Sequence, residues 1–307
     1  MQSISIVIPA FNEQKYIAQC LRSIEKHRHI IATSLEVTVV NNGSTDDTSK
    51  IAKQFAVNVL DIERHSVSYA RNFGVANSQG SVIAFVDGDV ELTEQWFVAL
   101  NQLACNLSDE QPIVTGFQCR VPPDGSWIEK HWFANLTDQY LGGANIITTR
   151  HTFSLLQGFD EQLKTGEDYD FCLRAIKQEL NYQVNSEFNA IHLGFPHRLQ
   201  DFIRREMWHG EGDFRSFEKF RQSIVAILAC YYLIATLAAL ICLVIQLYVF
   251  ASLFALSVLG LNGLITLKRF GLRSLSNFVI NYFLNGVYFF ARVGSLWKAL
   301  KKRHLKY

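Results

Sequence analysis

The sequence predicts an α/β fold, a mainly parallel β-sheet covered by helices, with membrane-associated helices following it. Two observations lead to this prediction. Apolar strand-like segments alternate with helical ones over the first 222 residues, and residues 223–267 carry no formal charge. The first 222 residues hold 20 Lys or Arg and 28 Asp or Glu, whereas the rest hold nine Lys or Arg and no acid. An acidic domain and a basic, apolar C-terminal part are therefore expected, and a nucleic-acid binder is disfavoured.

Strands and helices alternate from the N-terminus. Apolar runs of strand length occur at 4–8, 35–40, 57–62 and 82–86. The helix after the first run has Asn12 as its expected N-cap, and Ser44 or Thr45 is expected to cap a second helix that ends at Ala56. A third helix is expected over residues 66–76. Strands that alternate with helices in this way form a mainly parallel sheet, whose ligands bind beyond the carboxyl ends of the strands.

The N-terminus and the cysteines indicate a cytosolic, reduced domain. Residues 1–8 lead directly into the first strand, with no basic region, long apolar region or cleavage site typical of a signal peptide. The six cysteines have irregular spacing and no CxxC pair, so free thiols are expected rather than disulfides or a zinc site.

Polar clusters follow three of the predicted strands at equivalent places. They are Asn12-Glu13, the turn 41–47, and Asp87-Gly88-Asp89. Gly, Asn and Asp are ordinary turn formers, which explains any one cluster but explains three less well. Two carboxylates around a glycine can converge on a hard divalent cation, so Asp87 and Asp89 are candidate ligands of Mg²⁺ or Mn²⁺.

The uncharged stretch 223–267 is long enough for two membrane-spanning helices with a turn near Gln246. Basic residues flank both ends, which places both ends on the cytoplasmic side. A very apolar pair of core helices is the alternative. The predicted organisation is a catalytic domain over residues 1–222, a transmembrane hairpin over 223–267, and an interfacial region over 268–307.

A second uncharged block spans residues 274–291, in which Asn277, Asn281 and Asn285 recur every four residues and share one helical face. A third crossing would put the basic tail outside, against the charge rule, so an amphipathic helix in the cytoplasmic interface is preferred. The basic tail would then face anionic lipid. Two or three crossings both remain open.

The motifs together resemble the family 2 glycosyltransferases of the GT-A fold, which is Rossmann-like. The resemblance rests, in order, on the segments 5–13, 39–47, 70–74, 87–89, 158–161 and 166–174. It spans roughly residues 3–215. It implies a nucleotide-sugar donor, UDP-linked in most of the family, and a divalent metal that bridges the donor diphosphate. Asn41 stands where many relatives have Asp, which leaves GDP and dTDP open.

The resemblance also implies roles for individual residues. The nucleotide sugar would be surrounded by Pro9, Phe11, Glu13, Asn41, Ser44 and Arg71, with Asp87 at the ribose or the metal and Asp89 at the metal. His192 lies where relatives carry a metal or diphosphate ligand, although a structural histidine is the alternative.

On the acceptor side, Asp168 is the candidate general base of a single displacement with inversion. It starts a helix whose Phe171, Cys172, Ala175 and Ile176 are expected to pack inward. The alternative is that Asp168 and its neighbour Glu167 only complement the helix dipole. Arg204, Arg205 and Trp208 fall where processive relatives carry a Gln-x-x-Arg-Trp motif, of which this chain keeps only the Trp. These three residues and Glu167 would bind acceptor or diphosphate, or the two arginines would be solvated charges.

The predicted function is transfer of one sugar to a saccharide or lipid-linked acceptor, by an integral membrane protein with a cytoplasmic catalytic domain. A non-catalytic nucleotide-binding membrane scaffold is the alternative. A dehydrogenase is disfavoured, because the turn after the first strand lacks Gly-x-Gly-x-x-Gly.

Overall fold

The computed structural model describes residues 2–108, 111–136, 140–214 and 216–304, with side chains placed as far as residue 297. The chain forms two compact units. Unit 1 comprises Met1–Pro122 and Asp138–Phe195, and unit 2 comprises Pro123–Thr137 and Pro196–Tyr307. Charge and hydropathy along the sequence predict a domain border after residue 222. In the structure, the contacts between residues group 123–137 and 196–222 with the C-terminal helices instead.

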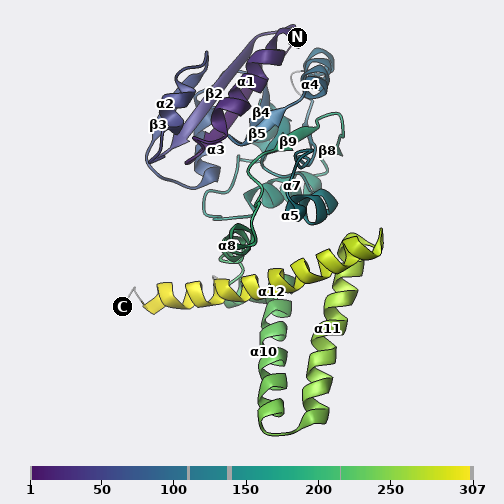
Figure 1. The fold of residues 1–307 in the computed structure, drawn as a ribbon. Helices are drawn as coiled ribbons and strands as arrows, with labels where there is room; N and C mark the ends of the chain where they lie inside the picture. The colour runs from purple at the N-terminus through teal and green to yellow at the C-terminus, as the bar shows by residue number, and fades with distance from the viewer. Residues whose placement is uncertain (1, 109–110, 137–139, 215, 305–307) are drawn as a thin grey trace. The chain divides into compact units, whose positions relative to one another are not determined.

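Unit 1 is built on a mainly parallel sheet, as predicted (Figure 1). Its strand order is β3-β2-β1-β4-β7-β6-β8, and only β7 runs antiparallel to its neighbours β4 and β6. A two-stranded sheet pairs β5 with β9. The strands are β1 (Ile4–Ala10), β2 (Leu35–Asn42), β3 (Asn58–Ile62), β4 (Val82–Val86), β5 (Val90–Leu92), β6 (Ile113–Gly116), β7 (Asn145–Thr149), β8 (Asn181–Val184) and β9 (Ala190–His192).

Both faces of the large sheet are covered, which explains why its central strands read as continuous apolar runs. Along β1, Ile6 and Ile8 pack into the core with α1 and α4, while Val7 faces the opposite core with α3, α6 and α7. Every residue of β1 and β4 is buried. The helices of unit 1 are α1 (Ile17–His27), η1 (Arg28–Ile30), α2 (Thr48–Ala52), α3 (Val67–Ala76), α4 (Glu94–Asn106), α6 (Arg150–Leu155) and α7 (Glu167–Lys177).

Two predicted helix caps are wrong. Asn12 does not cap α1, because its side chain accepts a hydrogen bond from the Thr45 N–H at 2.9 Å. Ser44 likewise accepts from the Asn12 N–H at 3.0 Å, and α2 is shorter than predicted. These side chains join two loops that are distant in the sequence, and a local pattern cannot reveal such long-range bonds. The helix predicted over residues 66–76 is confirmed as α3, and Ser66 caps it by accepting a hydrogen bond from the Tyr69 N–H.

The described residues of unit 2 form helices joined by turns and loops, and no strand. Its helices are α5 (Trp127–His131), η2 (Phe133–Asn135), α8 (Leu199–His209), α9 (Phe217–Gln222), α10 (Ile224–Val244), α11 (Tyr248–Phe270) and α12 (Leu275–His304). Trp132 organises the packing of this unit. Its ring lies 5.2 Å from Phe202 of α8, 5.1 Å from Phe270 of α11 and 5.4 Å from Tyr288 of α12, measured between centroids.

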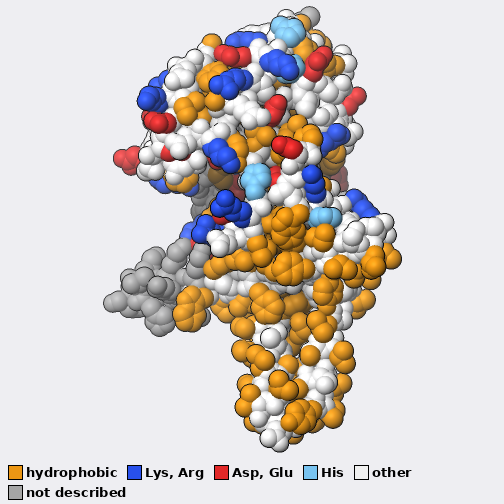
Figure 2. All heavy atoms as spheres, in the orientation of Figure 1, with side chains coloured by type: hydrophobic (Ala, Val, Ile, Leu, Met, Phe, Trp, Pro, Cys, Tyr) orange, Lys and Arg blue, Asp and Glu red, His pale blue; other side chains and the backbone are white. Residues whose placement is uncertain are grey.

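Helices α10 and α11 form the predicted hairpin, and its turn is where it was expected. Gln246 lies in the turn with a φ of 62°, a left-handed conformation that interrupts the helix. Both helices are long and apolar enough to span a membrane, and only 22% and 17% of their most apolar windows are buried. Figure 2 shows apolar side chains covering the hairpin, with no charged side chain visible along most of its length.

Helix α12 turns its asparagines toward the hairpin. Asn281 and Asn285 are fully buried, and the Asn285 side-chain amide donates to Asn262 Oδ1 of α11 at 2.8 Å. The outward face carries Leu275, Val279, Phe283, Phe290 and Trp297, all exposed. In Figure 1, α12 crosses the open end of the hairpin and does not run alongside it. The predicted asparagine face is therefore real, but it is the protein-facing side, and the exposed side is apolar.

Candidate active site

The candidate nucleotide-binding residues lie at the carboxyl ends of β1, β2 and β3. Phe11 follows β1 and is 37% exposed, and the Arg64 guanidinium lies 3.4 Å from the centroid of its ring. A cation stacked on an exposed aromatic ring makes a flat platform on which a planar base can pack. Pro9, the second-last residue of β1, is in register with Val40 of β2, and Ala10, the last, pairs with Asn41.

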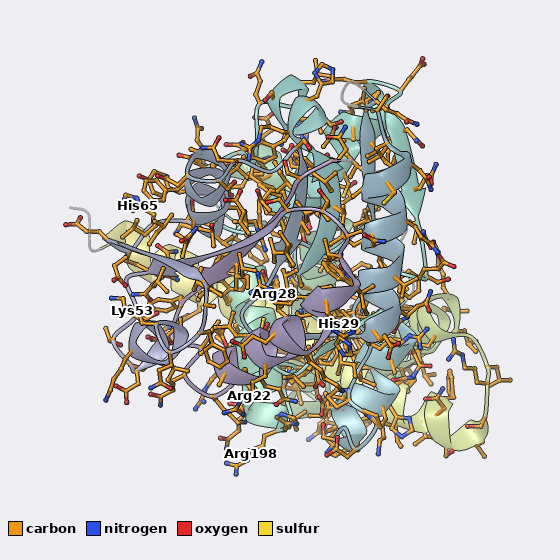
Figure 3. All side chains as sticks on the ribbon, turned by 90° about the horizontal axis from the view of Figure 1, so that it is seen from above. Arg22, Arg28, His29, Lys53, His65 and Arg198 are labelled. Atoms are coloured by element: carbon orange, nitrogen blue, oxygen red, sulfur yellow. The ribbon has the colours of Figure 1, made fainter. Side chains whose placement is uncertain are left out.

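Asn41 is held in one orientation by its neighbours. Its side-chain amide donates to Asp61 Oδ1 at 2.8 Å, and its Oδ1 accepts from the Ser44 N–H at 3.4 Å. Hydrogen bonds from Lys53 and Ser49 hold the pKa of the Asp61 carboxyl down at about 2. Figure 3 labels Lys53, and His65 lies above it at the left of the view. Asp61 and Arg64 were not predicted, although Asp61 lies at the carboxyl end of a predicted strand like the other candidates.

Four acidic side chains, Glu13, Asp46, Asp87 and Asp89, interact with one another near the carboxyl ends of these strands. Burial, followed by the charges of Asp89, Asp87 and Asp46, raises the pKa of Glu13 to about 8. Glu13 also packs against the Asp87-Gly88-Asp89 turn, since a Cβ on Gly88 would lie 3.3 Å from its Cγ. The three neighbouring carboxylates disfavour a further negative charge on Glu13, and a bound cation would offset part of this repulsion.

Asp89 and His192, 103 residues apart, lie side by side. The ladder of β5 and β9 pairs Val90 with His192, and the Asp89 Oδ2 lies 3.6 Å from His192 Nδ1. Gly194 permits this arrangement, because a Cβ there would come within 1.9 Å of Asp89 Oδ2. The need for this glycine was not predicted.

No group of three His, Cys, Asp or Glu in the described part of the chain is arranged to hold a metal ion. Asp87, the third predicted ligand, contacts Arg71 with its Oδ1 at 2.9 Å. One carboxylate and one imidazole nevertheless fit Mg²⁺ or Mn²⁺, because such ions are often bound by one or two carboxylates while substrate phosphates and water complete the shell.

The replacement Gly194→Ala tests the close approach of Asp89. The added methyl group is expected to displace the Asp89 carboxylate and weaken Mn²⁺ binding by about 10- to 100-fold, as disturbing the support of a metal ligand does. Isothermal titration with Mn²⁺ measures the effect. Gly142→Ala is the matched control, since a Cβ at Gly142 meets no atom within 4 Å. Equal Mn²⁺ affinity in both variants would contradict the assignment.

Asp168 lies in the first turn of α7 and is half-buried. Its Oδ2 accepts from the Gly143 N–H at 2.9 Å, and its Oδ1 accepts from the Tyr169 N–H at 2.8 Å. A carboxylate that accepts two hydrogen bonds keeps further lone pairs with which it can accept a proton. Phe171, Cys172 and Ala175 pack inward as predicted, whereas Ile176 is 41% exposed and its predicted burial is wrong.

Arg71 and Glu167 are engaged with each other. Arg71 is 2% exposed, and its Nη1 lies 2.7 Å from Glu167 Oε1. Burial raises the pKa of the Glu167 carboxyl, and the Arg71 charge opposes that rise. The α3 residue Arg71 thus joins the Asp87 turn to the start of α7.

The remaining predicted residues, Arg204, Arg205 and Trp208, lie on α8 in unit 2. Arg204 is exposed and pairs with Asp201, and Arg205 pairs with the buried Glu206 at 2.7 Å. Trp208 is 49% exposed. All six cysteines are free, as predicted.

The mainly parallel sheet and its covering helices define an α/β fold of the GT-A type. The sequence profile described as "Glycosyl transferase family 2" matches residues 5–180. This chain belongs to the family 2 glycosyltransferases.

Individual relatives resemble parts of the chain. The glycosyltransferase AglE of Haloferax volcanii is 37% identical over 99 residues, which cover 30% of this chain and 32% of AglE. The chondroitin synthase of Pasteurella multocida is 28% identical over 189 residues, which cover 56% of this chain and 18% of the synthase. The matched segments thus span less than a third of either relative. The mannosyltransferase PcManGT of Pyrobaculum calidifontis, solved with GDP-Man and Mn²⁺, has a TM-score of 0.56 at 15% identity over 97% of this chain and 88% of its own.

Proposed function

We propose that this protein transfers one sugar, with inversion, from a nucleotide-diphosphate sugar to an acceptor at the cytoplasmic face of a membrane, with the help of a divalent metal. The observation that carries the proposal is the placement of Asp89 in the turn that follows β4, where its Oδ2 lies 3.6 Å from His192 Nδ1. Family membership supports a sugar donor. The GDP-Man and Mn²⁺ bound by PcManGT, which shares the fold, support a nucleotide donor with a metal.

The chain's own residues divide the reaction between two places. Asp168 takes the proton from an acceptor hydroxyl as its oxygen bonds to the anomeric carbon, and the bond from that carbon to the diphosphate breaks. Asp89 and His192 would hold the metal. When bound, the metal supplies a positive charge that stabilises the departing diphosphate. Phe11 and Asn41 hold the base, with UDP, GDP and dTDP all compatible with an amide at Asn41.

A thermal-shift screen of nucleotide sugars with Mn²⁺ tests this function. A donor that binds the folded state raises its melting temperature in proportion to concentration and affinity. One donor, or one nucleotide series, is expected to stabilise the protein, and only with Mn²⁺ present. A flat response across UDP-, GDP- and dTDP-sugars would contradict the proposal. Binding without any transfer or donor hydrolysis would favour the scaffold.

We propose further that α10 and α11 span the membrane while α12 lies in its cytoplasmic interface. The hairpin and the outer face of α12 expose apolar side chains, and residues 223–307 contain nine cations and no acid. Apolar surface continuous with basic charge fits an anionic lipid surface. Asn285 finds its partner within the protein, at Asn262 Oδ1 of α11, as a polar group shielded from water must.

Reporter fusions distinguish two crossings from three. Green fluorescent protein fused after Tyr307 is expected to fluoresce, which requires the cytoplasm, whereas alkaline phosphatase at that position is expected to be inactive. Alkaline phosphatase inserted at the α10–α11 turn, beside Gln246, is expected to be active and serves as the matched control. An active phosphatase after Tyr307 would place the end outside and make α12 a third crossing.

A further inference from the structure

Arg71 lies between two acidic elements that belong to opposite sides of the candidate reaction. Its Nη2 contacts Asp87 Oδ1 at 2.9 Å, in the turn that leads to the metal side. Its Nη1 contacts Glu167 Oε1 at 2.7 Å, next to the candidate base. The side chain is 2% exposed, and even its unpartnered Nε is buried. The guanidinium therefore offers little surface to a nucleotide.

Gly143 connects Arg71 to Asp168. A Cβ on Gly143 would lie 2.6 Å from Arg71 Nη2 and 2.9 Å from its Cζ, so only glycine fits against the guanidinium. The N–H of the same Gly143 donates to Asp168 Oδ2 at 2.9 Å. A shift of the guanidinium would therefore reach the base through Glu167 on one side and through Gly143 on the other.

We propose that Arg71 is a positioning residue that braces Asp168 against the Asp87 turn, and that it does not bind the nucleotide. This inference rests on the proposed function of Asp168 as the base. It replaces the role in nucleotide binding that the family resemblance implies for Arg71. The brace holds the metal-side turn and the base in one fixed arrangement before the substrates bind.

Arginine is suited to this place because its planar guanidinium presents several N–H donors in a rigid fork, whereas lysine is a single point charge on a flexible stem. Burial alone would lower the pKa of the Arg71 guanidinium, but the charges of Asp87 and Glu167 outweigh it and raise that pKa. The side chain is therefore a permanent cation between two carboxylates.

The variants Arg71→Lys and Gly143→Ala test the brace from two directions. Arg71→Lys keeps the positive charge but loses the planar guanidinium with its several donors. Gly143→Ala displaces the guanidinium without removing any charge. Each is expected to lower kcat by about 100-fold, the effect of a displacement of about 1 Å at a reacting group. The Kd of the nucleoside diphosphate, measured by calorimetry with Mn²⁺, is expected to stay unchanged. Gly142→Ala is expected to leave both quantities at their wild-type values.

A loss of nucleoside diphosphate affinity as large as the loss of kcat would overturn the proposal and make Arg71 a nucleotide ligand. A double-mutant cycle adds a second criterion. If Arg71 acts through Glu167, the variant with both Arg71→Lys and Glu167→Gln loses no more kcat than the worse single variant. If the double variant instead lost kcat by the product of the two single losses, Arg71 would act independently of Glu167 and the proposal would be overturned.

These measurements separate the brace from the proposed function. If the wild-type protein bound a donor but transferred nothing, the proposed function would fail. The nucleotide Kd of Arg71→Lys would still decide whether Arg71 is a ligand. Melting temperatures identify any variant that fails to fold. If Arg71→Lys fails to fold, Gly143→Ala still tests the proposal, because it adds only one methyl group.

Discussion

Asp168→Asn is expected to reduce kcat by roughly 10²- to 10⁴-fold, the contribution of a positioned general base. The amide keeps the shape of the side chain, and its oxygen can still accept the Gly143 N–H, so the fold and the loop should persist. An amide cannot take up the acceptor proton. Donor affinity, measured by calorimetry with Mn²⁺, is therefore expected to remain at the wild-type value while transfer is lost.

Asp170→Asn is the matched control for this prediction. Asp170 lies in the same first turn of α7, but its carboxylate pairs with Arg174 at 2.8 Å, four residues along the helix. It contributes the same negative charge near the helix N-terminus. If Asp168 acted only on the helix dipole, the two variants would behave alike. Full activity in Asp168→Asn would remove the base assignment.

Asp89→Ala is expected to abolish metal-dependent donor binding and to lower kcat/KM by on the order of 10³-fold, because a Lewis acid contributes several kcal/mol to the transition state. The substitution removes the carboxylate that lies beside His192. Calorimetric titration of Mn²⁺ with the nucleoside diphosphate present measures the loss. The melting temperature without metal is expected to change little, since less acidic repulsion offsets the lost contacts.

Glu91→Gln provides the comparison. Glu91 lies two residues further along the chain, in β5, and its Oε2 accepts a hydrogen bond from Gln19 at 2.7 Å, a bond that an amide oxygen can keep. Glu91→Gln removes one negative charge two residues from Asp89 and leaves the Asp89–His192 contact in place. Mn²⁺ binding is expected to persist in this variant. Equal losses of Mn²⁺ affinity in the two variants would mean that Asp89 contributes only negative charge and is not a metal ligand. Unchanged Mn²⁺ affinity in Asp89→Ala would place the metal at another site.

The sequence was sufficient for the four parallel strands β1, β2, β3 and β4, whereas the buried strand β7 was not predicted. Residues such as Val7 and Phe85 lie in strands buried on both faces, and this burial produces continuous apolar runs. β6 and β8 are short and have no comparable pattern, and β8 is largely exposed, so they were not predicted. The turn at Gln246 was predicted because it interrupts a long uncharged stretch.

The candidate site was predicted only in part. Asp89 and Asp168 lie in motifs that are visible along the chain. Gly143 and Gly194 matter because side chains distant in the sequence, Arg71 and Asp89, press against them in the fold. Such a requirement is a property of three-dimensional packing and leaves no local signal. The same reason explains why the partners of Arg71 could not be predicted.

The anomeric configuration of the released sugar tests the central claim most directly. With the donor identified by thermal shift and Mn²⁺ present, slow transfer to water supplies a product even without the natural acceptor. Proton NMR of the first-formed sugar is expected to show the anomer opposite to that of the donor, and Asp168→Asn is expected to form none. Release of the donor's own anomer would contradict a single displacement at this site.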